Sequence, residues 1–291
     1  MKSDLKALLR SKSYLMANSF RKGFFKTLEI LRDYLPDIVI AGGWAPFIYY
    51  HYLISNKEIE PLRTKDIDIV VPNKLEKRAA KTIDESLTEA GFKPRFRSRH
   101  ILPVVTYEGN VEGYEVEIEF LTELKGSGKN VVMKVQQGLH AQALRFISLL
   151  LENTIVVKIA DFMVPEGKIL KIRVPAPAAF IFNKGLIFVR RNKRAKRAKD
   201  LYYIFDILAN CQELHSEIID SFGEFKKNYH TSWLNRFLRN LNAYFSDVTS
   251  EGIHLVQSQR PDGAFPRMND EQLRQYVLGI FQEFIGQIEC L

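Results

Sequence analysis

The segment TKDIDIVV, residues 64–71, constrains the fold of this chain more than any other stretch of the sequence. Side chains alternate across a β-strand, so Asp66 and Asp68 project from one face while Ile67 and Ile69 pack on the other. Two carboxylates this close repel each other unless a cation lies between them, and the usual cation is a hard divalent metal with oxygen ligands. The segment therefore predicts a strand with a metal site on one face.

A glycine pair upstream adds a second constraint. The apolar run Ile38–Ala41 ends in Gly42 and Gly43 and then enters a segment with a helical pattern. A strand, a glycine turn and a helix N-terminus present free backbone N–H groups and a positive dipole end, which suit a phosphate group. A purely structural turn is the alternative interpretation. A phosphate-binding turn followed by metal-binding acids is typical of a nucleotide-handling site.

Composition narrows the class of partner. Lys and Arg number 42 against 34 acids, a net charge of +8 that favours an anionic partner such as a nucleoside triphosphate or a nucleic acid, although it also aids solubility. Seven cations fall within residues 190–199, directly before Asp200. Two distant cysteines indicate neither a disulfide framework nor a zinc site. No apolar run is long enough to span a membrane and no signal peptide is evident, so we expect a cytoplasmic protein.

Periodicity predicts an α+β fold, in which a mixed sheet with flanking helices is followed by a helical C-terminal domain. We expect N-terminal helices over 1–35, an α/β core over 36–175 and a helical domain over 176–291, with the boundary at Pro175-Ala176-Pro177. In the core, the predicted helices cover residues 44–54, 75–90 and 144–151, and the predicted strands cover residues 38–41, 64–71, 96–105, 114–121, 155–159 and 169–174. In the helical domain, the predicted helices cover residues 178–189, 195–208, 213–221, 233–245 and 270–288.

The predicted strand 114–121 alternates acidic and apolar residues, so Glu115, Glu117 and Glu119 share one face. Each of them is a candidate third acid beside the pair at 66 and 68. The alternative is a structural role, in which these glutamates pair across a hairpin, turning at residues 110–113, with three basic residues. Those residues are Arg95, Arg97 and Arg99.

Together these motifs resemble the nucleotidyltransferase superfamily typified by DNA polymerase β and kanamycin nucleotidyltransferase. The motifs are Gly42-Gly43, Thr64-x-Asp66-x-Asp68 and an acid on a later strand. Within the superfamily, the chain most resembles the AbiEii-like branch of minimal bacterial enzymes, which includes toxins of toxin–antitoxin systems. Residues 119–122 resemble the third-acid strand of that branch. Residues 174–201 resemble its helical half, where a lysine and a Lys-Asp pair recur.

The resemblance implies transfer of a nucleotidyl group from a nucleoside triphosphate to an acceptor, with release of pyrophosphate. It implies two magnesium ions held by Asp66, Asp68 and Glu119, with Glu117 as the alternative third acid. The family often has aspartate at this position, so a glutamate departs from the pattern. Gly42, Gly43 and Thr64 would bind the nucleotide. Trp44 stands where many relatives carry a small polar residue, and core packing is its favoured role.

The helical half contributes two further candidates by resemblance. Lys184 interrupts an apolar helix and would contact the triphosphate; the alternative is a side chain that reaches the surface. Asp200 would orient Lys184 or a basic neighbour; the alternative is an ordinary acid at a helix start.

Several functions stay open at this stage. The leading one is metal-dependent nucleotidyl transfer to tRNA or another RNA, to a protein or to a small molecule, with a possible antitoxin partner. A second is an inactive protein of the same fold that binds nucleotide or RNA. A third is a nucleotide-sugar glycosyltransferase that uses the Asp-x-Asp pair.

Overall fold

The structure is a computed structural model that describes residues 21–56, 59, 61–62, 64–96, 105–111, 113–126, 131–160, 169–261 and 263–291. The described chain forms two compact units. The first unit contains the residues up to Ala45 and those between Thr64 and Val174; the second contains those within Pro46–Leu62 and Pro175–Leu291. Among the helices that the structure describes, none is both long and apolar enough to cross a bilayer.

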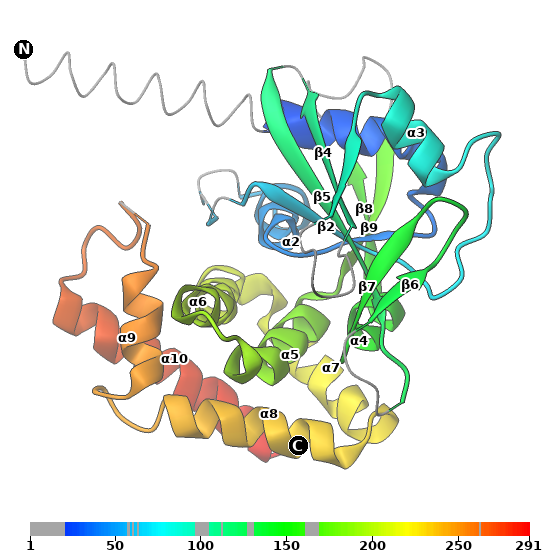
Figure 1. Cartoon of the computed structure of the whole chain (residues 1–291). Helices are drawn as coiled ribbons and strands as arrows, with labels where there is room; N and C mark the ends of the chain where they lie inside the picture. Colours follow the sequence, from blue (N-terminus) through cyan, green and yellow to red (C-terminus); the bar gives the residue numbers. More distant parts are fainter. Residues whose placement is uncertain are drawn as a thin grey trace, which may run out of the picture. The chain divides into compact units, whose positions relative to one another are not determined.

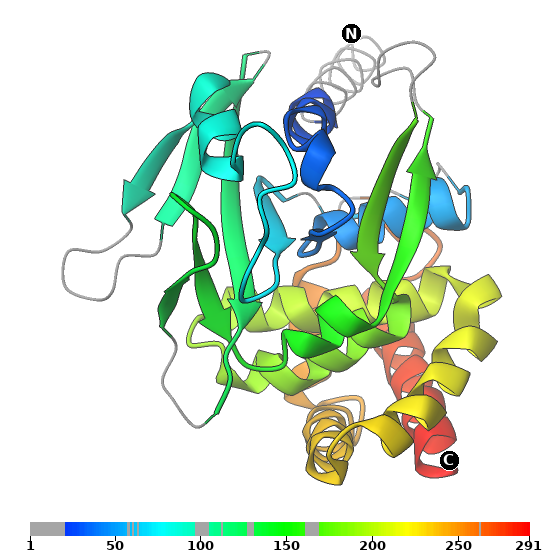
Figure 2. The same ribbon diagram turned by 90° about the vertical axis from the view of Figure 1, so that its right-hand side faces the viewer.

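The first unit is built on a mixed sheet, for which the described residues give nine strands. The order is β3-β4-β5-β2-β1-β9-β8, with β7 added beside β5 and β6 beside β7 (Figures 1 and 2). The strands are β1 (Val39–Ile40), β2 (Asp66–Val70), β3 (Lys93–Phe96), β4 (Val105–Val111), β5 (Tyr114–Glu123), β6 (Val132–Lys134), β7 (His140–Leu144), β8 (Thr154–Ile159) and β9 (Leu170–Pro175). Strand β2 pairs antiparallel with β1 and parallel with β5. The predicted α+β class with a mixed sheet is therefore confirmed.

One face of this sheet is apolar and covered. Ile67 and Ile69 of β2 lie opposite Ile118 and Phe120 of β5, and all four are buried. The helix over residues 21–30 reaches this face, since a Cβ on Gly23 would lie 3.0 Å from a methyl group of Val116. Helix α3 (Ile83–Glu89) reaches it as well, because the Tyr107 hydroxyl donates to Asp84 Oδ1 at 2.6 Å.

The opposite face is divided between acidic and apolar residues. At one end it carries the side chains of Asp66 and Asp68. At the other end, Val70 joins Val39 and Leu150 in an apolar cluster under the short helix α4 (Ser148–Glu152). The acidic residues therefore occupy only that part of the face that lies beyond this cluster.

The second unit is helical. After α2 (Trp44–Ile48) the chain forms one π-helical segment, η2 (Tyr49–Leu53), and Pro175 leads into α5 (Pro177–Ile187). The remaining helices are α6 (Arg194–Asn210), α7 (His215–Asn228), α8 (Thr231–Tyr244), α9 (Glu251–Ser258) and α10 (Asp270–Glu289), with 3-10 turns η3 (Phe188–Arg190) and η4 (Gln212–Leu214). Aromatic rings fill the core, as where Phe182 packs edge-on against Phe237 at 5.2 Å.

Several element predictions need correction. The predicted helix 75–90 is helical only as α3, because Thr82 and Glu85 form a capping box that starts the helix there. The N–H of Leu75 instead donates to Val135 O at 2.8 Å, which draws residues 75–82 into an irregular connection. Strands β6 and β7 and helix α9 were not predicted. The predicted strand 96–105 is wrong as a single strand, because Phe96 ends β3 and pairs with Val105 at the start of the antiparallel strand β4. The residues between these two, and the first predicted N-terminal helix, lie outside the described residues.

Candidate active site

The glycine turn and the acidic strand meet at Gly42 and Asp68. Gly42 has a φ of +60°, and a Cβ placed on it would lie 1.9 Å from Asp68 Oδ2. The N–H of Ala41 donates to Asp68 O at 2.8 Å, which continues the β1–β2 pairing up to the turn. Only glycine combines this left-handed backbone with room for the neighbouring carboxylate. The glycine turn and the acidic strand, the two sequence features that most constrain the fold, are therefore in direct contact.

The parallel pairing of β2 with β5 places four acids on one face. Asp68 lies level with Glu119, and Asp66 lies level with Glu117. All four side chains are partly exposed. Glu115 continues the same face at an exposed position. The sheet therefore forms a band of carboxylates that begins beside the glycine turn.

The chemistry of these carboxylates fits magnesium. Carboxylate oxygens are the hard ligands that Mg²⁺ prefers, and neighbouring strands supply them from two segments of the chain. In the orientations described, however, no three His, Cys, Asp or Glu side chains of the described residues are grouped closely enough to hold a metal ion. A magnesium site here would require these side chains to turn toward a common centre.

The alternative, in which the glutamates of β5 pair with three arginines across the hairpin, is wrong for Arg95. In the β3–β4–β5 arrangement Arg95 lies on β3, next to β4, and its Nε binds Glu108 at 2.8 Å. Across the β4–β5 hairpin, Glu119 lies opposite Thr106 and Glu117 lies opposite Glu108. Arg97 and Arg99 lie outside the described residues.

Trp44 directly follows the glycine pair and is part of the core. Its ring stacks on Phe24 with centroids 3.8 Å apart and planes 6° apart, and the residue is 3% exposed. Gly43 before it is buried, as is Thr64 ahead of β2. The packing of Trp44 anchors the start of α2, so the turn is fixed to the core on its helical side.

In the second unit, Lys184 and Asp200 form a buried ion pair. Lys184 Nζ lies 2.7 Å from Asp200 Oδ1, and the two residues are 8% and 3% exposed. The ammonium group also lies over the rings of Phe180 and Tyr203, at 5.3 and 5.7 Å from their centroids. Lys184 therefore does not reach the surface. Asp200 lies inside α6, well beyond its first residue Arg194, so the role of an acid at the helix start is also excluded.

Asp200 has a second basic partner that the sequence analysis did not single out. Arg191 Nε donates to Asp200 Oδ2 at 2.7 Å. Burial alone would raise the pKa of Asp200, but the charges of Lys184 and Arg191 outweigh it and hold the pKa below the usual value for a carboxyl. Arg191 lies at the start of a long basic run, so nothing in the sequence distinguished it from its neighbours.

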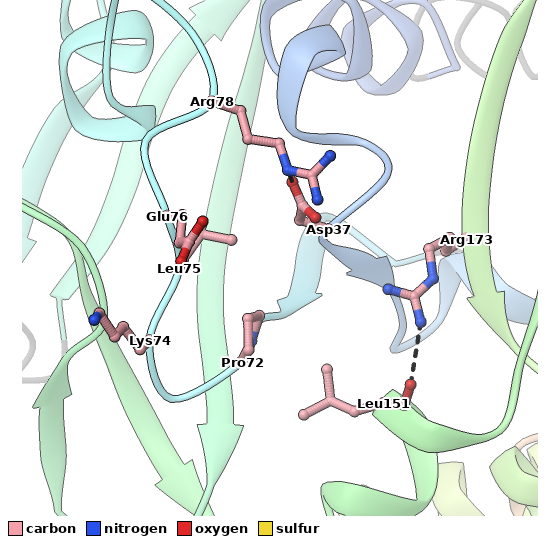
Figure 3. A pocket seen from close by; sticks show the side chains of 8 residues that line it. All are labelled: Asp37, Pro72, Lys74, Leu75, Glu76, Arg78, Leu151 and Arg173. Atoms are coloured by element: carbon pink, nitrogen blue, oxygen red, sulfur yellow. Dashed lines mark hydrogen bonds and ion pairs between the residues drawn. The ribbon is translucent and has the colours of Figure 1, made fainter.

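A pocket of about 400 Å³ opens in the first unit (Figure 3). None of the predicted site residues lines it. Its lining residues are Asp37, Pro72, Lys74, Leu75, Glu76, Arg78, Leu151 and Arg173.

A strand that carries two acids beside a glycine turn, within an α+β core, is the arrangement expected of an enzyme that handles nucleotides. A family model described as Nucleotidyltransferase matches residues 30–224. The chain belongs to this nucleotidyltransferase family, and the family suggests transferase activity. Comparison with curated proteins and with solved structures gave no significant match.

Proposed function

We propose that this protein is a metal-dependent nucleotidyltransferase that moves a nucleotidyl group from a nucleoside triphosphate to an acceptor hydroxyl or phosphate. The observation that carries the proposal is the contact between Asp68 and the Gly42 turn, with Glu119 level with Asp68 on the next strand. A phosphate-binding turn and a band of carboxylates are thereby adjacent. The proposed acceptor is an RNA such as tRNA, with a protein as the other option.

We assign Asp66, Asp68 and Glu119 as the ligands of Mg²⁺, with Glu117 as the alternative to Glu119. When bound, magnesium would neutralise the charge that develops on the phosphoryl oxygens and on the leaving pyrophosphate. The backbone at Gly42 and Gly43, with Thr64, would hold the phosphates. The acceptor oxygen forms a bond to the α-phosphorus, the bond from that phosphorus to the pyrophosphate oxygen breaks, and a carboxylate takes the acceptor proton.

We further propose that residues 36–175 form the catalytic core and that residues 176–291 form a helical domain, preceded by N-terminal helices over 1–35. The helical domain contributes Lys184 to the triphosphate, with Asp200 fixing the orientation of its ammonium group. Their buried ion pair supports the second part of this assignment, because it holds the Lys184 ammonium group in one orientation. The contact with the triphosphate is proposed from the resemblance. We propose three further properties from the sequence alone. They are membership of the AbiEii-like branch, an antitoxin partner and a cytoplasmic location.

The test is incubation with each labelled nucleoside triphosphate, magnesium, total tRNA and cell protein. We expect label on one acceptor class, and loss of labelling in Asp66→Asn and Asp68→Asn. Glu115→Gln is the matched control, since it removes a charge from the same face at its exposed end and should retain transfer. Absence of label on every RNA and protein would overturn the proposal.

The same assay decides the third acid. If Glu119 fulfils this role, Glu119→Gln should reduce transfer to background while Glu117→Gln retains most of it. The opposite result would transfer the role to Glu117.

An inactive nucleotide-binding protein is the second candidate. It is favoured by the lack of a grouping of three possible metal ligands among the described side chains. Calorimetric titration with a nucleoside triphosphate separates the two functions. An inactive protein should bind the nucleotide equally well with and without magnesium, whereas the enzyme should require the metal.

A further inference from the structure

The acidic face of the sheet also carries a buried threonine, Thr106 of β4. The residue is 0% exposed, and its hydroxyl oxygen makes no hydrogen bond within the part of the chain that the structure describes. Burying a hydroxyl without a partner is unfavourable. Valine has nearly the same shape, favours strands as threonine does and would avoid this cost. The stability of the sheet therefore does not explain why a hydroxyl is present here.

A second buried threonine in the same sheet shows how a hydroxyl with a structural role is satisfied. Thr122 lies on the neighbouring strand β5 and is also 0% exposed. Its Oγ1 lies 2.8 Å from Val71 O and 2.7 Å from Asn73 Oδ1, and either oxygen can accept its proton. These contacts join β5 to the end of β2. The Thr106 hydroxyl makes no such contact in the described structure.

The strand pairing places Thr106 beside one particular acid. The antiparallel pairing of β4 with β5 brings Thr106 level with Glu119, and the parallel pairing of β5 with β2 brings Glu119 level with Asp68. Level side chains on antiparallel strands project from the same face, with Cβ atoms about 4.5–5.5 Å apart. A threonine, the candidate third acid and a candidate metal ligand therefore form one row across three strands.

Glu119 is the acceptor that this row offers to the Thr106 hydroxyl. On its other side Thr106 lies level with Arg95 of β3, whose guanidinium can only donate. Glu117 is a diagonal neighbour, and such neighbours are about 7–8 Å away. Because Thr106 is fully buried, a substrate in solvent does not reach its hydroxyl. An effect of this hydroxyl on the site would therefore act through Glu119.

The other candidate third acid has a different neighbour on β4. Glu117 lies level with Glu108, which is a like charge and cannot donate a hydrogen bond when ionised. The carboxylate of Glu108 is bound by Arg95, with Oε2 and Nε 2.8 Å apart. Of the two rows that cross β2, β5 and β4, the row of Glu119 thus combines a glutamate with a neutral donor.

We propose that Thr106 is a positioning residue whose hydroxyl donates to the Glu119 carboxylate when that carboxylate turns toward Mg²⁺. The inference rests on the proposed function and selects Glu119 over Glu117 as the third acid. A carboxylate that binds a metal keeps lone pairs for a further donor, and that hydrogen bond fixes its orientation toward the metal. The buried hydroxyl would then gain its hydrogen bond together with the metal.

The test is calorimetric titration with a non-hydrolysable nucleoside triphosphate analogue at increasing magnesium concentration. It gives the Mg²⁺ concentration that supports half of the binding. Thr106→Val removes the hydroxyl at nearly constant volume and should raise this concentration about tenfold or more, as is typical when the hydrogen-bond partner of a metal ligand is lost. Thr106→Ser keeps the hydroxyl and should remain close to the wild type. Thr106→Val should not lower the urea midpoint measured without magnesium, because the hydroxyl makes no hydrogen bond in the described structure.

Thr122→Val is the matched control. It makes the same chemical change at a buried position of β5, but the side chain projects from the face opposite to Glu119. It should lower the urea midpoint, because it removes the contacts with Val71 and Asn73. It should leave the magnesium requirement unchanged.

A double-variant cycle tests whether Thr106 acts through Glu119. In the Glu119→Gln background, Thr106→Val should have no further effect on the magnesium requirement, whereas in the Glu117→Gln background its effect should persist. An unchanged requirement in Thr106→Val, or an effect that persists in Glu119→Gln, overturns the inference while a wild type that needs magnesium and transfers label keeps the proposed function. A wild type that needs no magnesium and transfers no label overturns both.

Discussion

Replacing Gly42 by alanine tests the contact on which the candidate active site depends. Two costs are expected. The first is the left-handed backbone, since φ is +60° at this position. The second is steric, because the new Cβ would lie 1.9 Å from Asp68 Oδ2 and 2.7 Å from its Cγ. Asp68 must therefore leave its position or the turn must open.

A second glycine separates the two costs. Gly91 has a φ of +89°, and a Cβ placed there would meet no atom within 4 Å. Gly91→Ala should therefore lose only about 1–2 kcal/mol of unfolding free energy, from the backbone conformation. Gly42→Ala should lose this amount and about 1–3 kcal/mol more from overpacking, a total of roughly 2–5 kcal/mol.

Urea unfolding of the wild type and four variants measures the effect. The variants are Gly42→Ala, Gly91→Ala, Asp68→Ala and the double variant Gly42→Ala/Asp68→Ala. Removal of the carboxylate relieves most of the clash, so the two changes should couple by about 1 kcal/mol or more. Nucleotidyl transfer by Gly42→Ala should fall with the displacement of Asp68, whereas Gly91→Ala should remain active. The reasoning is refuted if Gly42→Ala costs no more than Gly91→Ala and its cost is unchanged by Asp68→Ala.

Two predictions concern the buried acids of the second unit. Asp200→Asn should destabilise the protein by about 3–5 kcal/mol in urea unfolding, because Lys184 and Arg191 keep their charges without a carboxylate; a loss below that of the exposed control Asp220→Asn would contradict this. Burial raises the pKa of Asp206 to about 7 despite hydrogen bonds from Tyr50 and Asn210. Its contribution to stability is therefore fully present below the ordinary carboxyl pKa and is lost as pH rises toward about 7, whereas that of Asp200, with its lowered pKa, is lost as pH falls. Asp206→Asn should remove the loss of stability between a pH of about 4 and 7. Identical slopes of the unfolding free energy against pH for the wild type and this variant would refute the prediction.

The faces of the strands could be predicted from the sequence, but their pairing could not. The two-residue period correctly placed Asp66 and Asp68 on one face and the alternating glutamates of β5 on one face. Which glutamate lies level with Asp68 depends on a parallel pairing between segments far apart in the chain, and no local pattern encodes it. Arg95 was misassigned for the same reason, since β4 lies between β3 and β5.

The predicted helix over residues 75–90 is wrong in its first part, because groups distant in the sequence bind the backbone there. Residues 75–82 have helical spacing, yet Leu75 binds the backbone of Val135, and Gln136 Oε1 accepts from the N–H of Ile83 at 2.9 Å. These partners stabilise a non-helical path up to the capping box at Thr82. In contrast, the lysine at 184 could be predicted to have an anionic partner, because burying an unpaired cation in an apolar helix costs a large free energy. Its identity as Asp200 came only from the resemblance to a family.

The band of carboxylates brings acids level with each other on neighbouring strands, since both level pairs of β2 and β5 join two acids. Like charges directly opposite each other destabilise a sheet unless other groups balance them. On β4, Arg95 balances Glu108. The register is nevertheless fixed, because a shift of one residue would bring Ile67 and Ile69 to the acidic face and carboxylates into the core. The covered apolar face thus keeps the acids of β2 and β5 level with one another. The same packing that stabilises the sheet therefore places side by side the carboxylates that we propose as magnesium ligands.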